Sequence, residues 1–278
     1  MFATRIDNDR KAQTGWIHSV WAIVAPLAFW GALWFVAYRS IGKDLLFASP
    51  VQVLRQLSDI VRSPAAWRAI AVSLTRMLSA FLLGVVSGCL ISALTSASRL
   101  ADILLRPALT AIRATPVASF IILALVWLRG AYVPVFAATL MVLPIIWANL
   151  TEGIAAVDKD LLEMAQVFHL GRLRTIRHII LPSLRGTFLA ACNASIGLCW
   201  KAMIAAEVLS VPRDAMGTQL YNAKVYLRTD TLFAWTLLII LLSTAIERLF
   251  LRLTRSRLNN YPNSPVENGN KEGSNHAE

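Results

Sequence analysis

Six long apolar stretches dominate the pattern of hydrophobic and polar positions along the chain. They lie at about 17–38, 72–94, 103–128, 133–150, 187–209 and 232–251. Because a helix rises about 1.5 Å per residue, roughly 20 apolar residues cross a hydrocarbon core about 30 Å thick. The pattern therefore predicts an all-α integral membrane protein with about six transmembrane helices. We expect Pro107 and Pro116 to interrupt the third of them.

Polar segments precede and follow this membrane domain, which we place at residues 17–258. Segment 259–278 has no apolar periodicity, and we expect it to be disordered. Six spans put both ends of the chain on one side of the membrane. If that side is the cytoplasm, the inner segments hold moderately more Lys and Arg than the outer ones, as the positive-inside rule requires. We therefore expect segment 1–16 and the C-terminal tail in the cytoplasm.

The composition agrees with lipid as the solvent. Hydrophobic residues make up 56% of the chain and charged residues only 15%, whereas soluble domains carry about 25% charged residues. The net charge of +11 does not indicate a nucleic-acid partner, because the basic residues lie in loops and at the ends of apolar stretches. The three cysteines lie inside apolar stretches without C-x-x-C spacing, so neither a metal site nor a disulfide framework is predicted.

The longest polar segment between spans, residues 151–186, has the pattern of two short helices. We expect Asp160 to cap the first helix, with Glu163 completing a capping box. We expect Gly171 to end that helix and Pro182 to end the second, basic one. Four residues fall at helical spacing on one side of the first helix: Leu162, Ala165, Phe168 and His169. The chemistry leaves two roles open, a rigid lever in water or a basic loop that anchors two spans at anionic headgroups.

Charged residues within the apolar stretches are costly in hydrocarbon and are candidates for a solute pathway. The candidates are Arg76, Arg113, Lys201 and Glu207. Lys201 and Glu207 are six residues apart, so they do not share a helix face, and each needs a partner elsewhere. Snorkelling to the interface or polar contacts between helices are the alternative roles.

A repeat of small residues in the second stretch indicates helix packing. Gly84, Gly88 and Ser92 recur every four residues and would form one smooth stripe on a helix. Such a stripe allows a second backbone to approach closely.

Segment 158–185 resembles the cytoplasmic EAA loop of ABC-importer permeases. Glu163-Met164-Ala165 matches the start of that motif and Ile179-Ile180-Leu181-Pro182 its close, with the family's separation. Met164 replaces the first Ala, and His169 stands at the usual Gly position, two residues before Gly171. Four further stretches resemble, in order, those of nitrate, sulfonate and taurine permeases: FASPVQVLRQL, SLTRMLSAFLLGVVSG, LLRPALTAIRATPVASF and WKAMIAAEVLSVPRDAMGTQLYNAK.

The resemblance implies a type I ABC-importer permease fold in the bacterial inner membrane, with the 158–185 loop coupling the spans to an ATPase. It implies two cytoplasmic ABC ATPases, a second permease subunit expected to be identical, and an extracytoplasmic solute-binding protein. The coupling residues would be Glu163, Ala165, Phe168 and Gly171, with Leu181 and Pro182 as rear support. Gly171→Pro or Glu163→Arg would then abolish uptake. The solute stays open among nitrate, sulfonates, taurine and pyrimidines.

The chain has no nucleotide site of its own, because no G-x-x-x-x-G-K-[ST] motif occurs. We therefore expect a transport subunit that is not an enzyme and holds no cofactor, with ATP hydrolysed by a partner. An ion-gradient-driven secondary transporter is the alternative, since it would use the same charged spans without a stiff loop. A membrane-embedded enzyme would need clustered catalytic groups, yet the four histidines are scattered.

Overall fold

The structure, a computed structural model, describes residues 24–26, 28–43 and 45–258, and in these ranges all regular secondary structure is helical. The predicted segments 1–16 and 259–278 and the start of the first span lie outside the described residues. After a first helix, Val24–Ile41, the described helices follow in chain order: α2 (Pro50–Arg62), α3 (Pro64–Ala97), α4 (Arg99–Ala114), α5 (Val117–Trp127), α6 (Val133–Ala155), α7 (Lys159–Val167), α8 (Arg172–Thr175), the π-helical turn η1 (Ile176–Ile180), α9 (Leu181–Ser210), α10 (Met216–Val225) and α11 (Thr229–Leu258).

Five of these helices are long and apolar enough to cross a membrane, or six if the bent pair α4–α5 is one span. Most of the helices extend beyond the predicted apolar stretches. The second span was expected at 72–94, for example, but α3 runs from Pro64 to Ala97. Hydropathy marks only the part of a helix that lies in hydrocarbon, whereas backbone hydrogen bonding continues into water.

The third apolar stretch breaks at one proline rather than two. Pro107 lies inside α4, which continues through it, while α4 and α5 meet at an angle of 108° beside Pro116. Thr115 precedes Pro116 and is extended, with φ −82° and ψ 132°. The ring of a proline disfavours helical geometry in the residue before it, which explains the position of this bend.

The centre of the bundle is α6, which packs between α3 and α9. Gly84 and Gly88 on α3 lie very close to α6. A Cβ added at Gly84 would lie 2.5 Å from the Val142 Cβ, and one added at Gly88 would lie 2.7 Å from the Ile146 Cβ. One turn further, the Ser92 and Thr151 hydroxyls are 3.2 Å apart. The small-residue stripe thus lies where two helix backbones meet.

Gly84→Ala is expected to lower the free energy of unfolding by about 1–3 kcal/mol, because the added methyl overpacks the α3–α6 contact. Gly186→Ala is the matched control, since no atom lies within 4 Å of a Cβ at this helical glycine. The measurement is the temperature at which the buried Cys199 thiol becomes reactive in detergent. Equal temperatures for the two variants would contradict the prediction.

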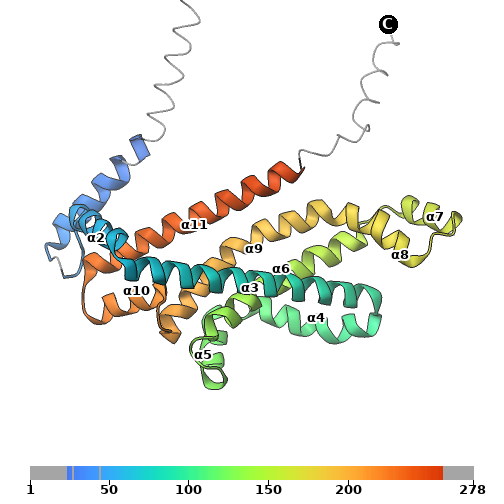
Figure 1. Cartoon of the computed structure of the whole chain (residues 1–278), viewed down its shortest axis with the longest axis horizontal. Coiled ribbons are helices and arrows are strands. Elements are labelled where there is room, and N and C mark those ends of the chain that lie inside the picture. Colours follow the sequence, from blue (N-terminus) through green and yellow to red (C-terminus); the bar gives the residue numbers. More distant parts are fainter. Residues whose placement is uncertain (1–23, 27, 44, 259–278) are drawn as a thin grey trace, which may run out of the picture.

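The long helices place two groups of short elements at opposite ends of the molecule. Figure 1 shows α7 and α8 beyond the bundle at one end, and α2 and α10 at the other. The predicted coupling residues lie at the α7–α8 end, and Arg76 and Glu207 lie at the α10 end.

Candidate functional site

The segment between α6 and α9 forms a helical projection. Residues 151–155 continue α6, and α8 and η1 lead directly into α9, so little of the predicted 151–186 loop is irregular. Pro182 was expected to end the second helix, but it lies in the first turn of α9. In the π-helical turn before it, the Leu181 N–H donates to the Ile176 carbonyl five residues back. This wider turn lets the chain remain helical where proline removes a donor.

The first helix of the projection begins two residues earlier than the capping box requires. Asp158 is the N-cap of α7, and its carboxylate accepts a hydrogen bond of 2.9 Å from the Asp160 N–H. The predicted Asp160–Glu163 capping box is therefore wrong. Asp160 instead occupies the first turn, where a carboxylate favours the positive end of the helix dipole. Glu163 is exposed on α7.

A left-handed turn ends α7, and His169 provides it. His169 has φ +50°, its N–H donates to the Gln166 carbonyl at 3.0 Å, and the Leu170 N–H donates to the Ala165 carbonyl at 2.9 Å. These two bonds form a Schellman motif, which usually has glycine at the left-handed position. Histidine is among the residues that tolerate this conformation best. The turn therefore keeps the family's placement, at His169.

Gly171 does not end α7, contrary to expectation. It has φ −62° and immediately precedes α8, and nothing lies within 4 Å of a Cβ at this position. Because proline adopts the same φ, Gly171→Pro is not a test of the turn.

The projection has a small hydrophobic core of its own. Val157, Ala165 and Ile179 are buried together, with Leu162 and Leu170 packed against them. This cluster joins α7 to η1, and η1 continues into α9, so the projection is fixed to a membrane span.

Phe168 and the expected rear support, Leu181 and Pro182, are all exposed. Phe168 is 71% exposed and does not share the buried side of Ala165. Leu181, the expected rear support, is 58% exposed, and Pro182 beside it is exposed as well. Ile179 and Ile180 pack behind α7 instead. Helical spacing alone could not predict the position of Phe168, because the turn at His169 rotates this side chain away from the buried side.

A shallow groove of about 430 Å³ lies beside this cluster, between α7 and the following helical turns. Its lining is mostly aliphatic and comprises Leu162, Ala165, Gln166, Leu170, Arg172, Thr175, Ile176 and Ile180.

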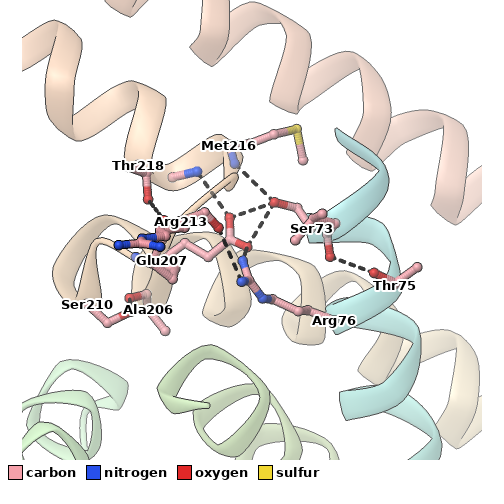
Figure 2. A network of polar contacts seen from close by, with 12 residues as sticks. Ser73, Thr75, Arg76, Ala206, Glu207, Ser210, Arg213, Met216 and Thr218 are labelled. Carbon is pink, nitrogen blue, oxygen red and sulfur yellow. Dashed lines mark hydrogen bonds and ion pairs between the residues drawn. The ribbon is translucent and has the colours of Figure 1, made fainter. Parts of the chain in front are cut away.

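At the opposite end of the bundle, Glu207 on α9 is the centre of a buried polar network (Figure 2). Its carboxylate is fully buried and accepts hydrogen bonds from the Ser73 hydroxyl at 2.8 Å and the Gly217 N–H at 3.1 Å. The Arg76 guanidinium forms an ion pair with it at 3.3 Å. A buried carboxylate requires such complete pairing.

The same network fixes the loop between α9 and α10. The Met216 N–H donates to the Ser73 hydroxyl at 3.0 Å, and Arg76 donates to the Arg213 carbonyl at 3.3 Å. The N-terminus of α10 thus points the Gly217 N–H at a carboxylate, which the helix dipole favours. Gly217 is required because a Cβ there would collide with Glu207.

The four charged candidates divide into one pair and two separate residues. Arg76 and Glu207 are brought together, which answers the expectation that Glu207 needs a partner on another helix. Lys201 and Arg113 are both exposed, and neither forms an ion pair with another described residue. Nothing in the sequence joins Glu207 to its further partners, Ser73 and Gly217.

The sequence also contained a charged residue that we did not single out. Glu247 lies within the 232–251 stretch, and its Oε1 would be 2.5 Å from a Cβ at Gly197 of α9. The Ser243 hydroxyl donates to it at 3.3 Å. A carboxylate inside an apolar stretch was the signal that could have identified it.

Comparison with known proteins decides the family. Residues 62–258 match the family described as the binding-protein-dependent transport system inner membrane component. The chain belongs to this family. The match covers α3 to α11 and so includes both the α7–α8 projection and the Glu207 network.

Its relatives include permeases of ABC importers. The chain is 28% identical to the putative aliphatic sulfonates transport permease protein SsuC of Escherichia coli (strain K12), over 80% of this chain and 87% of that protein. It is 24% identical to the taurine transport system permease protein TauC of the same organism, over 86% and 88% of the two chains. The ABC-permease prediction is confirmed, and the secondary-transporter alternative is not supported.

Solved structures confirm the predicted fold. A bacterial ABC transporter involved in the import of alginate matches with a TM-score of 0.60 at 17% identity, over 91% of this chain and 99% of that one. An amino acid ABC transporter matches with a TM-score of 0.61 at 18% identity, over 74% and 98%. Because of the family match, the chain is a multi-pass inner membrane subunit of a binding-protein-dependent transport system.

Proposed function

We propose that this chain forms the translocation pathway of an ATP-driven importer for a small organic oxyanion, and that the α7–α8 projection couples it to a cytoplasmic ATPase. The main support is the α7–α8 projection, which has its own hydrophobic core and exposes large apolar side chains at its tip. The assembly would contain two copies of the permease, two ATPases and an external solute-binding protein. Both chain ends would then lie in the cytoplasm.

The exposed tip supports the coupling role. Val167, Phe168 and Leu173 are exposed around the turn that ends α7. An apolar cluster that projects beyond a membrane bundle usually marks a contact with another protein. The Schellman turn and the small core make α7 stiff, so an ATPase that grips it can displace α9 as a rigid body. Glu163, Ala165 and Phe168 stay our proposed coupling residues, whereas His169 replaces Gly171.

The solute class is proposed from Lys201 together with the relatives. Lys201 lies nine residues before the end of α9, about 14 Å along the helix, which is close to the middle of a hydrocarbon core. A lysine exposed at that depth requires water or a counter-charge. An oxyanion in transit would supply the counter-charge, as sulfonate and taurine permeases among the relatives suggest. Arg113 lies in the last turn of α4, where the helix dipole already stabilises a cation.

The function is tested with the chain, its ATPase and its binding protein in proteoliposomes. We expect uptake of an alkyl sulfonate that requires ATP and the binding protein. Uptake that proceeds without the ATPase and follows an ion gradient would overturn the proposal.

Lys201→Gln is expected to reduce this uptake roughly 10–100-fold, because a hydrogen bond to a charged group contributes about 1.5–3 kcal/mol. Arg113→Gln is the matched control and should leave uptake nearly unchanged. Measuring ATP hydrolysis in the same vesicles separates a lost pathway contact from lost assembly. Equal uptake by the Lys201→Gln and Arg113→Gln variants would remove Lys201 from the pathway.

A further inference from the structure

The short helix α2 has three distinct faces, of which only one contacts the rest of the chain. Val53 and Ile60 are buried and Leu57 packs beside them, against the bundle that includes α11. The other two faces are mostly exposed in the isolated chain, and they differ in chemistry.

The second face of α2 is mostly aliphatic and the third is polar. Val51, Leu54 and Val61 dominate the second face, which also includes the exposed Ser58, and Leu54 is 61% exposed. The polar face holds Gln52, Arg55, Asp59 and Arg62. At about 100° per residue, the centres of the three faces lie roughly 110–140° apart. A helix with this distribution is stable where it meets protein, an apolar phase and water at once.

Trp67 indicates where that boundary lies. Its indole N–H donates to the Val61 carbonyl at 2.8 Å, which ties the start of α3 to the end of α2. Trp67 is 57% exposed and leads into the exposed apolar surface of α3 at Leu78, Leu82, Val86 and Leu90. Tryptophan prefers the membrane–water interface, so the aliphatic face of α2 lies at the level of that interface.

The orientation of α2 is fixed by contacts at both of its ends. Ser49 and Gln52 form a complete capping box at the start of the helix. Just before it, the Ala48 carbonyl accepts a hydrogen bond of 3.2 Å from the Trp34 indole N–H. One residue, Ser63, separates α2 from the membrane-spanning α3. The aliphatic face is therefore presented in a constant direction.

We infer that α2 lies in the headgroup layer of the leaflet opposite the α7–α8 projection. The aliphatic face contacts acyl chains, and Arg55 and Arg62 contact lipid phosphates. Two features favour lipid: the charge complementarity with phosphate, and the continuity with a membrane span. A stable protein interface uses about 20–30 residues a side, far more than this narrow face offers. The inference concerns anchoring in the bilayer and does not depend on the transported solute.

The test places photoreactive benzoylphenylalanine at position 54 or, as the matched control, at position 59 of the full chain. The chain is assembled with its ATPase in vesicles of phosphatidylethanolamine and phosphatidylglycerol, irradiated and digested. We expect a much higher yield of phospholipid adducts at position 54, which faces the acyl chains, than at position 59, which faces the headgroups and water. Adducts from position 54 to a second copy of the chain or to the binding protein would overturn the inference. Equal lipid yields at the two positions would also overturn it.

A second measurement tests the arginine contacts. Arg55→Gln combined with Arg62→Gln should lower the proportion of anionic phosphatidylglycerol among the lipid adducts at position 54. Asp59→Asn is the control on the same face and should not lower it. An unchanged proportion in the double variant would refute the phosphate contacts.

Discussion

Glu207→Ala is expected to lower the free energy of unfolding by about 3–5 kcal/mol, because it leaves a largely buried arginine without its partner. The Arg76 side chain is only 17% exposed in the intact protein and would face the space left by the carboxylate. The Ser73 hydroxyl and the Gly217 N–H would lose their acceptor as well. The measurement is the temperature at which the buried Cys192 and Cys199 thiols become reactive in detergent.

The combination of Glu207→Leu and Arg76→Leu provides the control for this prediction. Replacing both members of a buried ion pair with apolar residues costs less than removing one, since no unpaired charge remains. We expect the double variant to be more stable than the Glu207→Leu or the Arg76→Leu variant alone. If the two single losses simply add, the ion pair is not the origin of the effect.

His169→Pro is expected to abolish ATP-driven uptake while leaving membrane insertion intact. Proline has φ near −65° and no N–H, but position 169 requires φ +50° and a hydrogen bond to Gln166. The end of α7 cannot form this turn, so the projection loses the stiffness on which our proposed coupling depends. Uptake and ATP hydrolysis are measured together in proteoliposomes.

Two substitutions separate turn geometry from other effects at this place. His169→Gly keeps the left-handed turn and removes a steric cost of about 1–2 kcal/mol, so uptake should be retained. Gly171→Ala should also be tolerated, because its φ is ordinary and its surroundings are open. Loss of uptake in the His169→Gly variant would show that the imidazole itself is needed. Normal uptake in the His169→Pro variant would refute the role of the turn.

The candidate site was predicted unevenly. The sequence placed Glu163 and Ala165 on the first helix of the projection, because their spacing matches the EAA motif. It did not place Leu181 and Pro182, which were expected as rear support but are exposed at the start of α9. The end of α7 could not be placed either, since Gly171 satisfies the usual rule for a helix end, but the turn forms at His169. The two hydrogen bonds of the Schellman motif and the packing of Leu170 against the Val157–Ala165–Ile179 cluster outweigh the preference for glycine.

By itself, the sequence determined the solvent, the approximate number of membrane-crossing stretches and the family. Those properties depend on local quantities, namely the length of apolar runs and the spacing of motif residues. Only the tertiary structure decided that Glu207 pairs with Arg76 and Ser73, more than 130 residues away, while Lys201 in the same helix stays exposed. The tertiary structure also decided that the third stretch bends at Pro116 rather than at Pro107. Such outcomes depend on which helix faces meet, and hydropathy along one chain does not contain that information.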